Sequence, residues 1–220
     1  PQFPSAVEKQ TEAIPDHVRE QDTEGRQDCR DIFTFTIDPD DAKDFDDALS
    51  FQVLENGRIE VGVHIADVSY YVKPGGMIDQ EAFLRGTSVY LVDRTVPMLP
   101  ETLSNNLCSL RPNEDKFTFS AVFELNDKAE VQNQWFGRTI TYSDARFAYE
   151  EAQEIIEGKS HEFQKEILGI NSIARILRKQ RLSLGALNVE STEVRFEIDE
   201  NGEPVGTYLK VSKEAHQLIE

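Results

Sequence analysis

Six aspartates fall within ten residues of this 220-residue chain, and a single lysine offsets their charge. They are Asp38, Asp40, Asp41, Asp44, Asp46 and Asp47, with Lys43 among them. Carboxylates packed this closely repel one another unless a cation is bound between them. Mg²⁺ is usually held by a few carboxylates together with water and substrate phosphate. The pattern therefore indicates a magnesium site, in which Mn²⁺ is also possible; the alternative is an acidic turn exposed to solvent.

The residues on either side of the aspartates predict strands that would hold them in place. Residues 31–37 alternate between apolar and polar side chains, as a half-buried strand does. Residues 48–54 and 58–65 are rich in strand-forming residues, and the Asn-Gly pair at 56–57 between them is a strong hairpin signal. The aspartates would then lie in a loop between one strand and the next, held by a rigid sheet as a functional site requires.

Composition and charge limit the class of protein. The chain is 39% hydrophobic and 29% charged, which fits a folded globular domain, and no apolar run approaches a membrane span, so no membrane partner is expected. The net charge of −18 argues against nucleic-acid binding, unless the basic surfaces lie on parts of the protein outside this chain. Cys29 and Cys108 offer neither a disulfide framework nor zinc spacing, so we expect free thiols and a cytoplasmic location.

The remaining segments predict an α+β fold with a mostly antiparallel sheet and packed helices. Residues 1–30 are polar and contain three prolines, so they are interpreted as an irregular linker that enters the domain. The later patterns predict short helices at 79–86 and 101–105, strands at 87–92, 117–125 and 132–141, helices at 149–156 and 163–177, strands at 194–198 and 205–211 around a turn at 199–202, and a last helix capped by Ser212.

Residues 36–49 resemble the signature of the ribonuclease II/ribonuclease R family of 3′→5′ exoribonucleases. Further blocks of this family have counterparts in the same order at residues 64–69, 87–90, 96–100, 107–110, 185–187 and 214–220. The resemblance runs from about residue 3 to the end, and its details are most similar to a bacterial ribonuclease R. It implies that residues 31–220 are the N-terminal part of an RNB catalytic domain, truncated at its C-terminus, and that residues 1–30 link it to a preceding cold-shock (OB) domain.

The resemblance also assigns roles to four aspartates. They are Asp38, Asp44, Asp46 and Asp47, which would hold two divalent ions about 4 Å apart, as in other nucleases. Asp38 and Asp47 are expected to bind the better-held ion and Asp44 to help hold the second, while Asp46 would lie beside the reacting water or the RNA 3′ end. Asp44 and Asp46 are thus the catalytic candidates. In an extended strand Asp46 and Asp47 point to opposite faces, so the backbone must bend if both serve one site.

Two tyrosines and a histidine are further candidates. By resemblance, Tyr90 contacts the nucleotide at the RNA 3′ end, where stacking on a base tolerates any sequence; the alternative is a strand tyrosine that fills the core. Tyr149 is the second RNA-binding candidate, because the same resemblance places it near the active site; since it also lies on the apolar face of its helix, core packing is the alternative. His64 has apolar neighbours along its strand and is interpreted as a core histidine rather than a metal ligand.

The resemblance implies an enzyme that hydrolyses single-stranded RNA from its 3′ end to nucleoside 5′-monophosphates with Mg²⁺. The partner is the RNA 3′ end, and no obligate protein partner is evident. We expect the chain to be inactive alone, because the family's later arginine and glutamate have no counterpart before Glu220. Two alternatives stay open: a non-catalytic acidic module that binds calcium or a protein, and a degenerate family member that binds RNA without cutting it.

Overall fold

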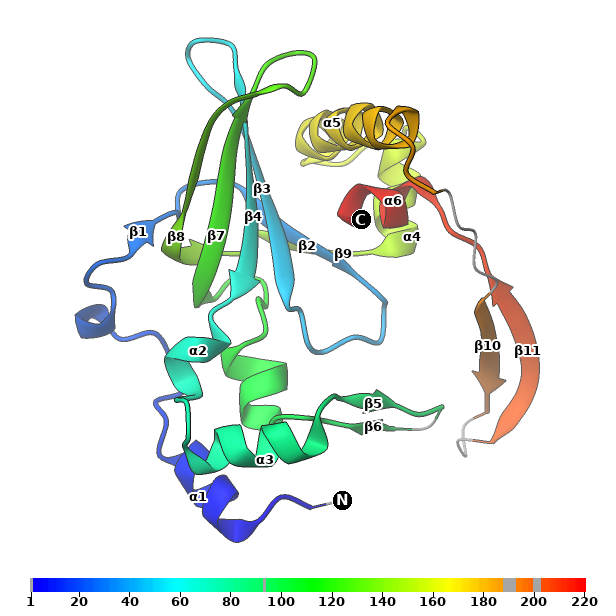
Figure 1. Cartoon of the computed structure of the whole chain (residues 1–220). Helices are drawn as coiled ribbons and strands as arrows, with labels where there is room; N and C mark the ends of the chain where they lie inside the picture. Colours follow the sequence, from blue (N-terminus) through cyan, green and yellow to red (C-terminus); the bar gives the residue numbers. More distant parts are fainter. Residues whose placement is uncertain (1, 93, 188–192, 200–202) are drawn as a thin grey trace.

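The computed structural model describes residues 2–92, 94–187, 193–199 and 203–220, and it confirms the α+β fold (Figure 1). The largest element is a seven-stranded sheet with the order β1-β8-β7-β4-β3-β2-β9. Its strands are β1 (Gln27–Asp28), β2 (Thr34–Asp38), β3 (Asp47–Val53), β4 (Ile59–Ala66), β7 (Asp115–Leu125), β8 (Val131–Tyr142) and β9 (Ala145–Ala148). The predicted hairpin around the Asn-Gly turn is β3–β4, within one residue of the expected bounds.

The sheet is mostly antiparallel, as expected, and it curls toward itself. Only β1–β8 and β2–β9 pair in parallel among its strands. Strand β9 was not expected from the sequence, because four residues are too few to show a period. Since only Ser143 and Asp144 separate β8 from β9, the chain passes directly from β8, the neighbour of edge strand β1, to β9 at the opposite edge of the sheet. The Asp144 N–H donates to the carbonyl of Thr34 at 2.7 Å and fixes this closure.

One face of the sheet is covered by three helices, α4 (Tyr149–Ile156), α5 (Gln164–Ser183) and α6 (Glu214–Ile219) (Figure 1). The core between them contains Phe35, Ile37, Leu49, Phe51, Phe147, Ile155, Ile167 and Ile170. Helix α5 approaches the sheet closely at Gly169, where a methyl group would overlap the ring of Phe51. Helix α6 begins at Glu214 after Lys213 as N-cap, so the expectation that Ser212 caps it was wrong by one residue.

A second core lies at the end of the sheet where β3 begins. It packs α1 (Ser5–Glu12), α2 (Val68–Tyr71), α3 (Met77–Arg85) and a π-helical turn (Leu103–Leu107) around Phe45, Ile78, Leu103 and Leu110. The expectation that residues 1–30 are irregular was therefore wrong. Helix α1 buries Val7 in this core, and β1 joins the sheet. The missed helix shows only two buried positions, Val7 and Thr11, too few to give a periodic signal.

Two small hairpins complete the structure. Strand β5 (Val89–Tyr90) pairs with β6 (Thr95–Val96), so the strand expected at 87–92 is only two residues long. Strands β10 (Glu193–Ile198) and β11 (Pro204–Lys210) pair as expected, while residues 200–202 of the predicted turn lie outside the described residues. Within the described residues, no helix combines the length and apolarity needed to cross a membrane. Cys29 and Cys108 are buried free thiols, as expected.

The middle of the sheet's other face is a buried layer of hydroxyl groups around His64. The layer contains Thr34, Thr36, Ser50, Thr118, Ser120, Thr139 and Thr141, each at most 3% exposed. His64 Nδ1 lies 2.6 Å from Ser120 Oγ and Nε2 lies 2.9 Å from Ser50 Oγ, so the ring joins β3, β4 and β7. Burial lowers the pKa of His64 to about 4. The interpretation of His64 as a core histidine is confirmed.

Acidification is expected to destabilise the protein through His64. Its pKa is about 4 in the folded state, below the value of about 6.5 for an unfolded chain. The unfolded state therefore binds a proton first, and stability falls as the pH drops from about 6.5 to about 4, by on the order of 3 kcal/mol. Urea unfolding near neutral pH and near pH 4.5 measures this loss. This loss of stability on acidification should be smaller in His64→Gln and unchanged in a control, His17→Gln, whose histidine is exposed. Equal losses in all three proteins would assign the effect to other groups.

Candidate active site

The aspartate loop connects β2 to β3 at the end of the sheet above the second core (Figure 1). Asp38 is the last residue of β2 and Asp47 the first of β3. The two strands pair only at Thr34↔Ser50 and Phe35↔Leu49, whereas β9 continues alongside β2 as far as Asp38. Strands β2 and β3 therefore part before they reach the aspartates, which leaves room for the loop between them.

The loop is fixed to the second core by Phe45 and Ser109. The Phe45 side chain is buried, and its backbone N–H donates to Ser109 Oγ at 3.0 Å. The same hydroxyl donates to the Lys43 carbonyl at 2.8 Å, and the Leu110 N–H donates to the Phe45 carbonyl at 2.8 Å. These bonds hold the backbone on both sides of Phe45 and so fix the two aspartates that flank it. Ser109 belongs to a block that resembles the family, but no sequence pattern indicated that its hydroxyl would hold the loop.

Three of the four assigned aspartates are held in surroundings that disfavour their charge. Burial, with repulsion from Asp47 and Asp44, raises the pKa of Asp38 to about 6, although the nearby Arg146 opposes the shift. Asp46 reaches solvent, but partial desolvation by surrounding protein and repulsion from Asp44 and Asp47 raise its pKa to about 6 as well. Burial also raises the pKa of Asp47. A bound cation would relieve all three carboxylates.

The carboxylates fit a hydrated divalent ion better than a preformed cage. Across the described ranges, no three Asp, Glu, His or Cys side chains converge closely enough to hold a metal by themselves. Mg²⁺ keeps several of its waters and needs only one or two carboxylates from the protein. The Oδ2 atom of Asp38 is buried and accepts no hydrogen bond of normal geometry from the described residues, as expected of a ligand atom, although the neighbouring Thr36 hydroxyl lowers the pKa of this carboxyl somewhat. Asp40 and Asp41 of the same loop are exposed to solvent.

Arg146 is a part of this site that sequence reasoning missed. It lies on β9, and its Nη2 donates to the carbonyls of Pro39 at 2.6 Å and Asp40 at 2.8 Å. Its guanidinium carbon is 5.4 Å from the ring centroid of Phe45. Arg146 thus holds the first turn of the aspartate loop. No sequence pattern pointed to Arg146, because neither β9 nor its parallel pairing with β2 was expected.

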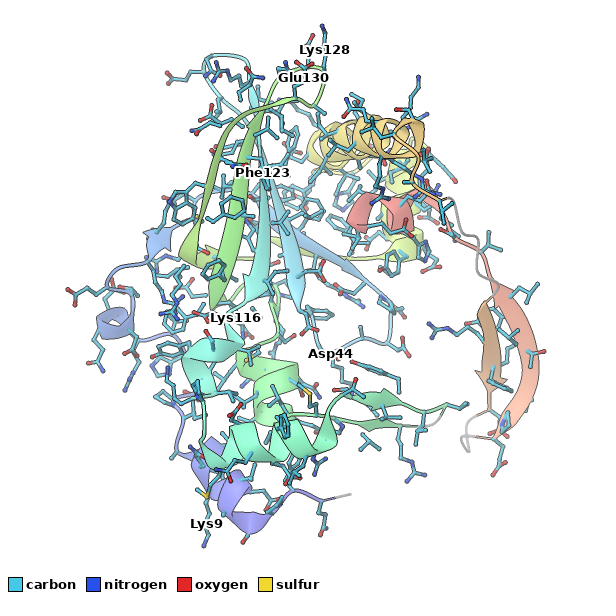
Figure 2. All side chains as sticks on the ribbon, in the orientation of Figure 1. Lys9, Asp44, Lys116, Phe123, Lys128 and Glu130 are labelled. Carbon is cyan, nitrogen blue, oxygen red and sulfur yellow. The ribbon has the colours of Figure 1, made fainter. Side chains whose placement is uncertain are left out.

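Tyr90 lies beside the aspartates rather than in a core. Its side chain is 66% exposed on β5, and its hydroxyl donates to Asp44 Oδ2 at 2.6 Å. This bond, together with partial desolvation, raises the pKa of Tyr90 to about 12. Figure 2 shows Asp44 on the part of the loop that faces β5 and β6. The alternative that Tyr90 fills the core is therefore wrong, and its ring is available to a ligand at the loop.

Tyr149 lies between the helical core and the aspartates. It is half-buried at the start of α4, and its ring stacks on His216 of α6 with centroids 4.0 Å apart. Burial raises its pKa, and the charges of Asp38 and Asp47 raise it further, which places the ring within their electrostatic range. Both sequence interpretations of Tyr149 therefore describe part of its environment. His216 reaches the Tyr149 ring because α6 packs against α4.

Two substitutions at Tyr90 are expected to distinguish the contribution of its ring to RNA binding from that of its hydroxyl. If the ring stacks on a base, Tyr90→Ala weakens RNA 3′-end binding by the whole protein by about 1–3 kcal/mol. Tyr90→Phe keeps the ring and loses only the hydrogen bond to Asp44, so it should retain most of the affinity. Fluorescence anisotropy with a labelled single-stranded RNA measures both. Equal losses in the two variants would show that the hydroxyl, not stacking, carries the contact.

Comparisons with known proteins agree with this geometry. A family described as the RNB domain matches residues 26–220. Ribonuclease R of Thermotoga maritima is 44% identical over 225 residues, covering 100% of this chain and 32% of that protein. The structure of Mycoplasma genitalium RNase R in complex with ribose-methylated single-stranded RNA has a TM-score of 0.91 at 27% identity, covering 99% of this chain and 35% of that one. Yeast Ssd1, described as a pseudonuclease, shares the fold with a TM-score of 0.68 at 23% identity, covering 77% and 21% of the two chains.

The chain thus spans about a third of the ribonuclease R proteins that it matches. The family match covers most of the sequence, and the Thermotoga relative aligns with all of it. The chain belongs to the RNB-domain family, and it is similar to bacterial ribonuclease R.

Proposed function

We propose that the whole protein is a 3′→5′ exoribonuclease that hydrolyses single-stranded RNA to nucleoside 5′-monophosphates with Mg²⁺, or with Mn²⁺ in its place. The observation that carries the proposal is the aspartate loop, where carboxylates with raised pKa values lie beside the exposed ring of Tyr90. Such a loop offers oxygen ligands to a divalent ion and an aromatic face to a base. Membership of the RNB family supports this reading of the site.

Within this proposal, the four assigned aspartates, Phe45 and Tyr90 have separate roles. Asp38 and Asp47 hold one divalent ion and Asp44 helps hold another, and bound ions would supply an activated water and a charge clamp on the phosphoryl oxygens. Asp46 orients the reacting water or the RNA 3′ end. Tyr90 stacks on the terminal base while its hydroxyl keeps Asp44 in place. The buried Phe45 holds the loop backbone rigid, so the carboxylates keep their positions when RNA enters.

The proposed substrate is the 3′ end of a single-stranded RNA, the kind of ligand named for the Mycoplasma RNase R complex. This chain carries 41 acidic and 23 basic residues, whereas affinity for RNA comes largely from cationic contacts with phosphates. We therefore expect the 220-residue chain to bind RNA weakly and to release few mononucleotides when assayed by itself. A cytoplasmic location accompanies the proposal, because both cysteines are free thiols.

The test is a degradation assay of the whole protein with Mg²⁺ on single-stranded RNA labelled at either end. A 3′ label should appear at once as mononucleotide, and a 5′ label should move through a ladder of shortening products. Early release of a labelled mononucleotide from the 5′ end, or internal cleavage, would contradict the direction of attack. RNA binding without any cleavage would favour the degenerate family member. Binding of neither RNA nor Mg²⁺ would favour an acidic protein-binding module.

A further inference from the structure

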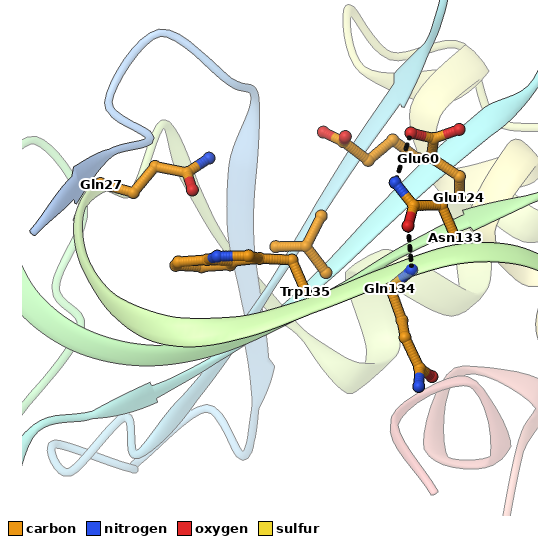
Figure 3. Close-up of a pocket in the computed structure, with 7 residues that line it drawn as sticks. Gln27, Glu60, Glu124, Asn133, Gln134 and Trp135 are labelled. Carbon is orange, nitrogen blue, oxygen red and sulfur yellow. Dashed lines mark hydrogen bonds between the residues drawn. The ribbon is translucent and has the colours of Figure 1, made fainter.

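A small pocket lies far along the sheet from the aspartates and contains the chain's one tryptophan (Figure 3). Its volume is about 90 Å³, and it is lined by Gln27, Glu60, Val122, Glu124, Asn133, Gln134 and Trp135. We call it the Trp135 pocket. Glu60 pairs with Gln52 on β3, whose first residue is Asp47. Gln52 lies five residues after Asp47 along β3, a distance of about 17 Å at the usual rise.

The indole of Trp135 forms a fixed platform in this pocket. Trp135 and Gly137 lie on the same face of β8, since they are two residues apart. A Cβ atom on Gly137 would lie 2.5 Å from Cζ2 of the indole, so the ring rests directly on the glycine backbone. The side chain is nevertheless 37% exposed. The strand therefore supports one face of the ring and leaves part of the ring open to a ligand.

Two carboxylates lie on the same face of the sheet as this platform. Glu60 pairs with Glu124 across β4 and β7, and Val122 pairs with Trp135 in a neighbouring row (Figure 3). Glu124 already accepts from Arg58 at 3.1 Å. Glu60 accepts only a neutral donor, the side chain of Gln52 at 2.6 Å, and none of the ion pairs found among the described residues includes it. The pocket is thus lined by an indole on β8 and, two strands away on β4, by a carboxylate that is paired with no cation among the described residues.

The pocket also borders a free strand edge. Strand β1 pairs with β8 only at Thr139 and Ile140, so residues 131–138 have no neighbour on that side among the described strands. The side chains of residues 131–136 are all exposed. Extended segments of other proteins bind sheets by adding a strand to such an edge. A segment placed here would carry its side chains past Trp135.

We propose that Trp135, Glu60 and Glu124 form a docking site for an arginine side chain on an extended, basic segment of a partner protein. A guanidinium group can stack on the indole and donate to a carboxylate at the same time. The net charge of −18 favours a cationic partner. The volume of about 90 Å³ is smaller than the roughly 150 Å³ cavity that holds a benzene ring. The pocket thus suits a guanidinium better than a nucleobase, and its carboxylates repel RNA phosphates.

The single tryptophan makes the site directly measurable, because all indole fluorescence of the 220-residue chain comes from Trp135. The probe is the peptide acetyl-Gly-Arg-Gly-Arg-Gly-amide, and its control carries citrulline, a neutral isostere, in place of each arginine. The arginine peptide should change the fluorescence saturably and protect the indole from acrylamide quenching. The citrulline peptide should bind about tenfold more weakly, as expected for loss of a cation on an aromatic ring beside a carboxylate.

Two substitutions, one inside the Trp135 pocket and one outside it, test whether Glu60 contributes to binding of the arginine peptide. Glu60→Gln keeps the shape of the side chain and should weaken binding of the arginine peptide about tenfold. Glu55→Gln, at an exposed turn position outside the pocket, should leave the affinity for this peptide unchanged. Circular dichroism checks that both variants fold, and the citrulline comparison on the unaltered chain does not depend on them. Equal binding of the arginine and citrulline peptides, no fluorescence response, or a stronger response to an oligouridylate would each overturn the proposal. These outcomes are independent of the proposed nuclease activity.

Discussion

Asp46→Asn in the whole protein is expected to slow RNA hydrolysis by about 10²–10³-fold while RNA affinity changes little. The substitution keeps the size of the side chain and removes the charge that Asp44 and Asp47 oppose in the folded protein. A carboxylate that acts on the reacting water stabilises the transition state more than bound RNA, so the loss should appear in the rate constant. Single-turnover kinetics gives the rate, and anisotropy with labelled RNA gives the affinity.

The matched control for this prediction is Asp40→Asn. Asp40 belongs to the same loop, but its side chain is 90% exposed and lies 3.8 Å from Arg146. Its replacement should leave the rate within a few-fold of that of the unaltered protein. If Asp46→Asn and Asp40→Asn slow the reaction equally, the effect comes from the charge of the loop as a whole. If Asp46→Asn weakens RNA binding as much as it slows hydrolysis, Asp46 binds substrate and does not act on the reacting water.

Asp38→Asn is expected to stabilise the metal-free protein and to weaken metal binding. The pKa of Asp38 is about 6 when folded, above the unfolded value of about 3.9. Between these values the folded state holds a proton that the unfolded state has released, so stability falls as the pH rises toward 6 and stays low above it. Removing the charge at neutral pH should therefore recover up to about 3 kcal/mol. Urea unfolding in a chelator measures this gain, and calorimetry with Mn²⁺ measures the lost affinity.

Asp41→Asn is the control, because Asp41 is an exposed aspartate of the same loop. It should change neither the metal-free stability nor the affinity for Mn²⁺ appreciably. As the pH rises, Asp38 lowers the stability of the folded protein whereas His64 increases it. The comparison between variants is therefore more informative than the pH dependence of stability in the unaltered chain. A loss of metal-free stability in Asp38→Asn, with Mn²⁺ affinity intact, would show that Asp38 is a structural residue.

Patterns within short stretches of sequence predicted several strands, one long helix and the aspartate loop. The alternation before Asp38 and the Asn-Gly turn located β2, β3 and β4 within a few residues, because each strand buries one face and the turn fixes the register. The helix expected at 163–177 is observed as α5, because its apolar residues recur along the helix on the side that packs against the sheet. The aspartate loop could be assigned before the structure because its charges are adjacent in the sequence.

The features that escaped prediction depend on contacts between distant segments. Strand β9 is four residues long and pairs with β2 in parallel, so its register follows from the whole sheet. Arg146 and Ser109 reach the loop only through that tertiary arrangement. The exposure of Tyr90 was not evident either, since a strand tyrosine fits a core equally well in sequence. Assignment of residues 1–30 to a linker from a preceding cold-shock domain remains a prediction.

Anomalous diffraction from crystals of this chain soaked in Mn²⁺ would test the proposed metal centre most directly, because it locates bound ions without an activity assay. We expect an anomalous peak in contact with the carboxylate of Asp38 or Asp47, and none in a crystal of Asp38→Asn soaked in the same way. A second peak beside Asp44 would place the second ion. Peaks found only at the exposed Asp40 and Asp41, or no peak at the loop, would contradict the claim that these aspartates form a metal centre.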